Sequence, residues 1–392
     1  MQYRVNTKSG NNISVLGFGC MRLPSRLGVI DIDKSETVIM EAIKQGVNFF
    51  DTAYIYPGSE VALGRILDRN KVRDKVYIGT KLPLSRCNSY EDFDLIFNEQ
   101  LTRLKTNYID YYFMHNISRH SDWKRLCELG IEGWIERKKH NGQIRQIGFS
   151  FHGVRDEFIK VVDAYDWDYC MIQYNYINSH FQAGVTGLRH AHSRGIPVFV
   201  MEPLLGGGLV KNLPKKAVAL FRRSNPNATN ASWALRWIWN QPEITMLLSG
   251  MNELSQVAEN VGLAVDAKVE SMTEEELTVV DEVTNLFLVS FKIPCTGCNY
   301  CLPCPKNINI PDSFTAYNIS YSVSRFAAIH QYATTIGGLK SIYSAADCTK
   351  CGKCEKECPQ NVEIIKSLEA VYKRLEPFWF RAGMAVARKF LK

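Results

Sequence analysis

With 392 residues, of which 46% are apolar, the chain is long enough to bury one large core and to carry a second, smaller domain. No run of about 18 apolar residues occurs and the first residues do not begin a signal peptide, so we expect a cytoplasmic protein without a transmembrane segment. The formal net charge is +7, but Lys and Arg are interspersed with acidic residues, and nucleic-acid binding is not indicated.

The N-terminal residues 1–13 alternate briefly and contain a turn-like stretch at 8–12, which predicts a β-hairpin. Downstream, eight short apolar runs alternate with eight helical patterns over roughly 250 residues, a repeat typical of an α/β fold of the (β/α)8 TIM-barrel type. A doubly wound sheet is the competing arrangement, but no GxGxxG motif follows the first strand. The predicted strands are Val15–Gly19, Val47–Asp51, Val76–Thr80, Ile109–Met114, Ile144–Ser150, Cys170–Tyr174, Ile196–Met201 and Ile244–Ser249. The predicted helices are Asp33–Gln45, Ser59–Asp68, Tyr90–Leu104, Trp123–Lys139, Asp156–Ala164, Gly187–Arg194, Thr229–Trp239 and Leu254–Ala264.

Four polar residues fall at the ends of consecutive predicted strands, on the barrel face that carries the chemistry in this architecture. Asp51 and Tyr56 belong to the second strand and its loop, and Lys81 and His115 end the next two strands. Carbonyl reduction by hydride needs a proton donor, and a Tyr hydroxyl can serve if a nearby cation eases its ionisation. We therefore predict Tyr56 as the donor, Lys81 as the cation, Asp51 as the partner of the lysine, and His115 as the group that orients the carbonyl oxygen. Each residue alone has an ordinary structural explanation, but four together favour an active site.

The motifs around these residues resemble the aldo-keto reductase family. The resemblance spans the predicted barrel in the family's order, and the family's catalytic tetrad falls on the same four residues without substitution. By resemblance, a nicotinamide cofactor, NAD(P)H, would have its amide near Ser150 and Gln173. Its adenosine end would lie near Ser249, Gly250, Glu259 and Asn260. The matching segments are Asp51–Tyr56, Ser59–Gly64, Thr80-Lys81, Asp110–His115, Gly142–Ser150, Gln173–Asn175, Pro203-Leu204, Ser249-Gly250 and Glu259-Asn260.

Two departures from the family pattern concern the cofactor. Typical members have Asn after the serine of the fifth-strand motif, whereas Phe151 and His152 follow here. His152 either replaces the asparagine's contact with the carboxamide or is a surface-loop histidine. Members that prefer NADPH usually place Lys or Arg near the eighth strand and the helix after it, to bind the 2′-phosphate. Gln256 occupies that region here, which slightly favours NADH.

Eight of the 12 cysteines crowd into two runs, which in a chain without a secretion signal favours metal ligation over disulfides. Each run has three cysteines at two-residue gaps and a fourth before Pro, as in ferredoxins whose fourth cysteine serves the other cluster. Two zinc sites with four thiolates each are the alternative. We predict one [4Fe-4S] cluster on Cys295, Cys298, Cys301 and Cys358, and a second on Cys348, Cys351, Cys354 and Cys304.

The composition change near Ile293-Pro294 predicts a domain boundary. We expect a barrel with an N-terminal hairpin over residues 1–285, and a small, mainly helical, ferredoxin-like domain over residues 286–392. The whole architecture resembles the subgroup of the aldo-keto reductase family with a C-terminal domain that carries two [4Fe-4S] clusters. The basic and apolar stretch Pro377–Lys392 is expected to form an amphipathic helix that docks on its own protein, with a membrane surface or a partner as the alternative.

The expected function is a nicotinamide-dependent oxidoreductase that reduces a small-molecule carbonyl or oxidises an alcohol, coupled to clusters that exchange electrons with a ferredoxin or flavodoxin. Hydride carries two electrons and each cluster takes one, so a flavin could divide the pair, although no flavin motif is recognisable. The alternative is an iron–sulfur electron-transfer protein or subunit whose barrel binds a nucleotide or partner without carbonyl chemistry. A third hypothesis is that the clusters are structural or sense oxygen.

Overall fold

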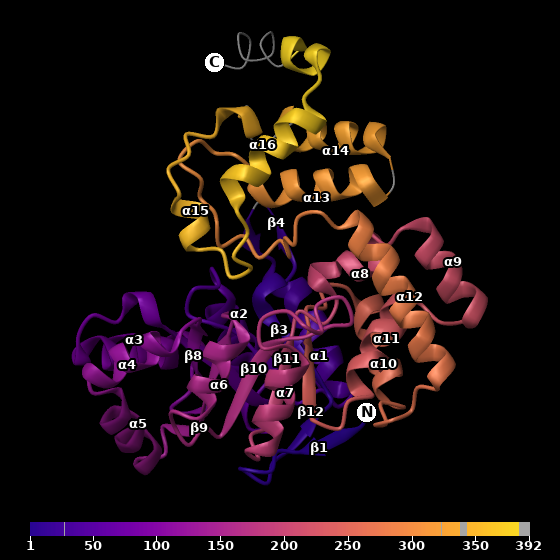
Figure 1. Cartoon of the computed structure of the whole chain (residues 1–392). Helices are drawn as coiled ribbons and strands as arrows, with labels where there is room; N and C mark the ends of the chain where they lie inside the picture. Colours follow the sequence, from indigo (N-terminus) through magenta and orange to yellow (C-terminus); the bar gives the residue numbers. More distant parts are fainter. Residues whose placement is uncertain (27, 323, 338–342, 384–392) are drawn as a thin grey trace. The chain divides into compact units, whose positions relative to one another are not determined.

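The computed structural model describes residues 1–26, 28–322, 324–337 and 343–383, which form two compact units (Figure 1). The first unit comprises Met1–Pro203 and Ala234–Thr273. The second comprises Leu204–Trp233 and Glu274–Lys392. Within the described residues, no helix is both long and apolar enough to cross a membrane.

Eight parallel strands of the first unit close into a barrel, which confirms the predicted fold class. Strands adjacent in the chain are adjacent in the sheet, and β12 pairs with β3 to close it, so that all strand ends of one kind meet on one face. The strands are β3 (Leu16–Gly19), β6 (Phe49–Asp51), β7 (Tyr77–Pro83), β8 (Ile109–Ile117), β9 (Ile144–Phe151), β10 (Tyr169–Gln173), β11 (Val198–Met201) and β12 (Ile244–Ser249).

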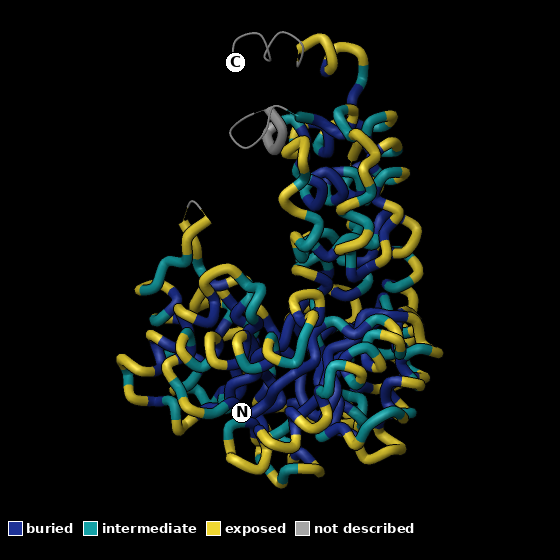
Figure 2. The backbone as a smooth tube through the Cα atoms, turned by 90° about the vertical axis from the view of Figure 1, so that its left-hand side faces the viewer, coloured by how far each residue is buried: buried dark blue, intermediate teal, exposed yellow. Residues whose placement is uncertain are grey.

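Large side chains fill the barrel interior, because alternate residues of each strand point inward and must pack without voids. Tyr169 is central to this core: its ring is 5.1 Å from that of Tyr111, 4.7 Å from that of Phe113 and 5.1 Å from that of Phe199. Figure 2 shows the same feature as buried backbone, in dark blue, along the barrel strands. The interior is thus a packed core, and any site has to lie at an end of the barrel.

The predicted N-terminal hairpin is present as β1 (Tyr3–Val5) and β2 (Asn12–Ser14). Ile13 of this hairpin belongs to the core cluster of the barrel interior. Asn48 ties the hairpin to the start of β6, because its side chain accepts from the Ser14 N–H at 2.9 Å and donates to the Asn12 carbonyl at 2.9 Å. The hairpin therefore lies at the amino-terminal ends of the strands, and the opposite end is left for the chemistry.

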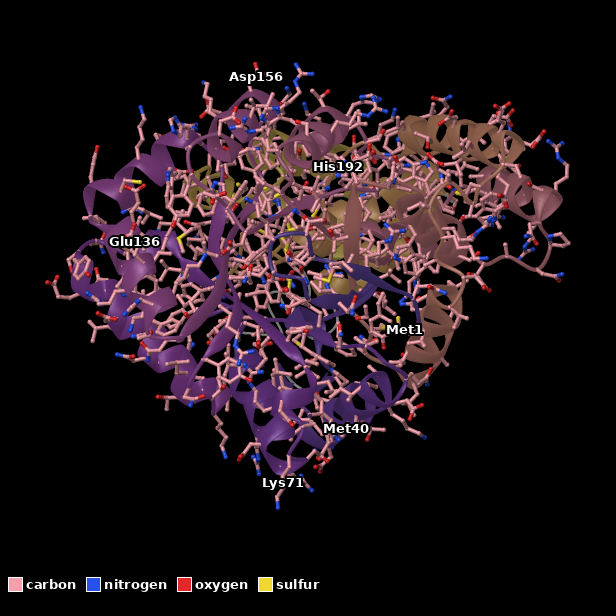
Figure 3. All side chains as sticks on the ribbon, turned by 90° about the horizontal axis from the view of Figure 1, so that it is seen from below. Met1, Met40, Lys71, Glu136, Asp156 and His192 are labelled. Carbon is pink, nitrogen blue, oxygen red and sulfur yellow. The ribbon has the colours of Figure 1, made fainter. Side chains whose placement is uncertain are left out.

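Helices surround the barrel; in Figure 3 the labelled residues Met40, Glu136, Asp156 and His192 lie on four of them, around the outside. One predicted helix, Trp123–Lys139, is in fact two, because Gly130 adopts a φ of +85°, a conformation that a continuous helix does not allow. The helices of the first unit are α1 (Ile32–Lys44), α2 (Ser59–Arg69), α3 (Tyr90–Leu104), α4 (His120–Glu128), α5 (Ile131–His140), α6 (Arg155–Val162), α7 (Gly184–Ser193) and α11 (Leu254–Ala264), and α10 (Asn230–Trp239) crosses from the second unit into the first.

Several elements are not predicted from the sequence pattern. A two-stranded hairpin of β4 (Ser25–Arg26) and β5 (Val29–Ile30) follows the first barrel strand. The stretch after β11 holds the helices α8 (Gly208–Lys211) and α9 (Lys215–Ser224), neither of which is among the predicted helices. A turn at Gly28, which has a φ of +81°, is the sequence signal that could have indicated the hairpin.

The second unit is mainly helical, as predicted. Its own hydrophobic core includes Phe314, Tyr332 and Leu368, and six of the eight clustered cysteines pack against that core. The cysteine runs are therefore supported by a small separate core. Its longer helices are α12 (Glu274–Ser290), α13 (Ile310–Ser322), α14 (Arg325–Gly337) and α16 (Ile364–Leu375), and one turn, α15 (Lys353–Lys356), lies in the second cysteine run.

The predicted C-terminal helix can be compared with the structure only over its first residues. Phe380 is buried in the core of the second unit, with its ring 5.7 Å from that of Tyr332. Met384 and Leu391, which would continue the apolar face, lie outside the described residues.

Candidate active site and cysteine cavities

Lys81 and Asp51 form a buried ion pair at the carboxyl ends of β7 and β6. Lys81 Nζ donates to Asp51 Oδ1 at 2.6 Å and to the Thr52 carbonyl at 2.6 Å, and both side chains are almost fully buried. Burial raises the pKa of Asp51 and lowers that of Lys81, and the attraction between the two opposes both shifts. The lysine is thus held in one place by two acceptors, and the aspartate beside it contributes most to balancing its charge, with a smaller contribution from Glu60.

Tyr56 and His115 complete the predicted group of four. The Lys81 ammonium lies 5.2 Å from the centre of the Tyr56 ring, and the Tyr56 and His115 rings are 6.1 Å apart in an edge-to-face arrangement. Burial and the charge of Lys81 hold the pKa of His115 well below its usual range. The imidazole is therefore neutral at pH 7, and it can donate or accept one hydrogen bond without carrying charge.

A buried polar network supports Lys81 from behind, and sequence reasoning missed it. Glu60, on the first turn of α2, is 2% exposed and accepts from Thr80 Oγ1 at 2.6 Å and from Gln100 Nε2 at 2.8 Å. Gln100 on α3 also donates to the Lys81 carbonyl at 3.1 Å, and Arg103 donates to Glu60 at 3.1 Å. The network ties α2 and α3 to the strand that carries the lysine. The buried charge of Glu60 in an otherwise apolar helix face is the signal that could have indicated it.

Ser150 and His152 are close to the group of four. Ser150 Oγ accepts from the Asn116 N–H at 2.9 Å, and Asn116 reaches it because its backbone has a φ of +60°. His152 follows β9, and its N–H donates to the Ile117 carbonyl at 3.2 Å. It is 7% exposed, so of the two alternatives for this residue the surface-loop histidine is excluded.

The imidazole of His152 faces a polar environment at this end of the barrel. Burial and the charge of Lys81 lower its pKa to about 4, against a hydrogen bond with Gln182 that raises it. Its Nδ1 is buried and has no hydrogen-bond partner among the described residues. Gln173, the last residue of β10, is also buried. The partnerless, buried Nδ1 of His152 fits a polar ligand such as a carboxamide, because buried polar atoms are almost always hydrogen-bonded.

The residues expected at the adenosine end lie after β12. Asn260 on α11 donates to Ser249 Oγ at 3.0 Å, and both side chains are buried. Gly250 and Glu259 are exposed. Gln256 accepts from the Asn252 N–H at 2.9 Å, so it stabilises the turn that leads into α11. The structure thus joins Ser249 to Asn260, whereas Glu259 is on the outer surface of the helix.

The eight clustered cysteines line two neighbouring cavities in the second unit. One is lined by Cys295, Cys298, Cys301 and Cys358. The other, with a volume of about 290 Å³, is lined by Cys304, Cys348, Cys351 and Cys354, and Cys301 borders it as well. In the described residues, no three His, Cys, Asp or Glu side chains come together as ligands of a single metal ion.

The fourth cysteine of each run faces the cavity of the other run, which is the exchange expected from the sequence. Four thiols around each cavity fit iron–sulfur clusters, whose irons are bound by four cysteine thiolates. Partial burial, and then the like charges of Cys295, Cys298 and Cys358, raise the pKa of the Cys301 thiol, so a positively charged group is needed to hold all four as thiolates.

Comparison with known proteins agrees with both halves of this description. The sequence model "Aldo/keto reductase family" matches residues 15–284, and the model "4Fe-4S dicluster domain" matches residues 294–363. The chain is 28% identical over 311 residues to L-galactose dehydrogenase of Arabidopsis thaliana, which covers 72% of this chain and 94% of the relative. It is 25% identical over 304 residues to probable aldo-keto reductase 1 of Glycine max, which covers 68% of this chain and 85% of the relative.

Solved structures show the same fold. An aldo-keto reductase from Bacillus halodurans, in its holo form, aligns with a TM-score of 0.60 at 24% identity over 72% of this chain and 96% of the other. An aldo/keto reductase from Klebsiella pneumoniae in complex with NADP and acetate aligns with a TM-score of 0.60 at 18% identity, with the same coverage of both chains. Because the family model accounts for more than half of the sequence, this chain belongs to the aldo/keto reductase family and is an oxidoreductase that carries an additional 4Fe-4S domain at its C-terminal side.

Proposed function

We propose that the protein transfers hydride between a nicotinamide cofactor and a small-molecule carbonyl or alcohol, with Tyr56 as the general acid and base. The observation that carries the proposal is the buried ammonium of Lys81, 2.6 Å from Asp51 and 5.2 Å from the centre of the Tyr56 ring. A cation at this place favours the ionised phenol, so the proton of Tyr56 is more easily given to a forming alkoxide.

The other two residues of the group have supporting roles. Asp51 balances the charge of Lys81 and, with the Thr52 carbonyl, fixes the position of the ammonium. His115, neutral at pH 7, donates a hydrogen bond to the substrate oxygen and so orients it towards the Tyr56 hydroxyl. Together they hold one substrate oxygen in place for protonation by Tyr56.

The nicotinamide cofactor supplies the hydride when bound. Ser150, His152 and Gln173 hold its carboxamide, and the buried Nδ1 of His152 supports this assignment. Ser249, Gly250, Glu259 and Asn260 hold the adenosine end, which the Asn260–Ser249 contact supports. The Klebsiella pneumoniae neighbours are complexes with NADP and NADPH. We nevertheless slightly favour NADH here, because Gln256 offers no charge to a 2′-phosphate.

The domain of residues 286–392 holds two [4Fe-4S] clusters on the two exchanged sets of cysteines, and the barrel of residues 1–285 carries the hydride chemistry. The clusters supply one-electron transfer when bound. Cys351 is the most exposed of the eight thiols, and its cavity is lined by Lys353 and Lys356 together with one acid, Glu357. The excess of positive charge supports an acidic protein partner such as a ferredoxin or flavodoxin. The protein works in the cytoplasm.

The test is Tyr56→Phe in the full chain with both clusters loaded. General acid catalysis contributes about 10² to 10⁴ in rate, so we expect kcat to fall at least about 100-fold with the cofactor Kd unchanged. Tyr54→Phe is the matched control, because it removes only a hydrogen bond to Glu99 from the same loop and should leave kcat unchanged. Full turnover by Tyr56→Phe would favour the alternative, an electron-transfer protein whose barrel binds a nucleotide or partner without carbonyl chemistry.

A further inference from the structure

Three of the most exposed aromatic side chains of the described residues are Phe326, Phe378 and Trp379, all in the second unit. They are 80%, 78% and 60% exposed. Large side chains of this kind are normally kept from water, and a group of them marks a surface that contacts something apolar. Both Phe378 and Trp379 belong to the predicted C-terminal helix, and among its described residues Phe380 is buried whereas these two are exposed.

The fold brings these residues to one region. Arg325, at the start of α14, donates to the carbonyl of Arg374, in the last turn of α16, at 3.0 Å. The two helices pack together and are drawn side by side in Figure 1. Phe380 is buried against Tyr332 of α14 and anchors the turn that follows α16. The two residues before it, Phe378 and Trp379, are therefore held at the surface by a buried neighbour.

The same region is basic on its outer side. Arg325, Lys373 and Arg381 are exposed. In residues 324–337 and 370–383 the sequence has a single carboxylate, Glu376, and it points inward. Glu376 accepts from Tyr332 at 2.8 Å and from Ser344 at 3.1 Å. The exposed charges of these two segments are thus all positive, and Arg388, Lys389 and Lys392 continue this pattern in the sequence.

We infer that Phe326, Phe378, Trp379, Arg325, Lys373 and Arg381 form a binding surface for an anionic lipid bilayer. Aromatic rings flanked by cations suit the headgroup region, where the rings enter the acyl boundary and the cations meet lipid phosphates. Each Lys or Arg near an anionic leaflet adds attraction that falls with salt. The acid next to this surface on α16 is Glu369, which is exposed but pairs with Lys350 at 2.6 Å. The exposed charges of the two segments themselves are positive, which favours a uniformly anionic partner over a protein, which presents both signs of charge.

The experiment uses the full chain with loaded clusters and two kinds of vesicles, one containing phosphatidylglycerol and one of phosphatidylcholine alone. We expect co-sedimentation with the first only, weakening as salt is raised. The fluorescence of Trp379 should shift to the blue on binding, and this shift should be absent in Trp379→Phe. The double substitution Phe378→Ser with Trp379→Ser should weaken partitioning at least about tenfold, because two large apolar side chains no longer leave water.

Leu95→Ser is the matched control, because Leu95 is 67% exposed on α3, outside this surface. It should bind vesicles as the unchanged protein does. Equal binding to both vesicle types, no binding to either, or binding unaffected by the double substitution would overturn the inference. Self-association in the absence of lipid, abolished by the double substitution, would also overturn it in favour of contact between copies of the chain.

Discussion

The ion pair of Lys81 and Asp51 can be tested with Asp51→Asn, which keeps the shape of the side chain and removes its charge. The two charged atoms are 2.6 Å apart, and at an effective dielectric constant of about 20 their attraction is about 6 kcal/mol. Desolvation of both groups offsets much of this attraction. Removing one partner of a buried pair typically costs about 3–5 kcal/mol. We expect the unfolding free energy at pH 7 to fall by an amount near the lower end of that range, because Lys81 can lose its proton instead of staying charged.

The loss of unfolding free energy in Asp51→Asn should increase as the pH decreases. Asp51 raises the pKa of Lys81 through its charge and its hydrogen bond, so the pKa falls further in the variant. The pKa of this lysine is lower in the folded chain than in the unfolded chain, where it is about 10.4. Above this unfolded-state value the lysine is neutral in both states and does not affect the unfolding free energy. As the pH decreases below it, the unfolded chain binds the proton more readily, and the unfolding free energy falls. The difference in unfolding free energy between the natural protein and Asp51→Asn should therefore grow from pH 10 to pH 7.

Urea unfolding, followed by the emission of buried tryptophans such as Trp134 and Trp167, measures this difference at several pH values. Lys81→Met and the double variant complete a cycle. At pH 7 the double variant should be more stable than Asp51→Asn, because methionine fills the same space without charge. A difference that does not change between pH 7 and pH 10, or a double variant less stable than Asp51→Asn, would refute the reasoning. Carbonyl reduction should be slowed in all three variants, because each lacks the cation beside Tyr56 or the charge that holds it.

Three further predictions concern packing, titration and cluster assignment. A methyl group at Gly64 would overlap the Arg103 carbonyl, so Gly64→Ala should lower the unfolding free energy by about 1–3 kcal/mol. The control Gly133→Ala, which has open space around it, should leave the unfolding free energy unchanged, and equal stabilities of the two variants would contradict the packing of α2 on α3. With the pKa of His152 lowered to about 4, its imidazole NMR resonances, assigned with His152→Asn, should not titrate between pH 5 and 8, and a midpoint near 6.5 would show an exposed ring. Cys358→Ala should lower the iron content by about half and leave the cluster signals of the Cys348 run in the EPR spectrum; loss of those signals instead would contradict the exchanged assignment.

The barrel could be predicted because each strand is a short apolar run between turns, and the tetrad because its members follow consecutive strands. Strand lengths could not be predicted. Lys81 and His115 lie inside β7 and β8, which continue to Pro83 and Ile117, because strands that are buried on both sides pair beyond the apolar run. The interruption at Gly130 depends on a positive φ that a glycine permits but does not require.

The contacts that support the site could not be predicted from the sequence either, because they join residues far apart in the chain. Gln100 meets Glu60 and the Lys81 carbonyl only once α3 has packed on α2 and β7. His152 looked as much like a surface residue as a ligand, because its burial depends on the packing of the loop after β9. Such contacts are set by tertiary structure, and no local pattern encodes them.

Because of the network around Glu60, the positions of the two outer helices α2 and α3 affect the position of Lys81 in the catalytic centre. Glu60 comes from α2 and Gln100 from α3, and both bond to the segment Thr80-Lys81. A substitution on the far sides of these helices that moves them by a fraction of an ångström would displace the carbonyl of the lysine without touching substrate or cofactor. Variants selected for altered activity should therefore include changes on the outside of the barrel, where a search limited to the pocket would not look.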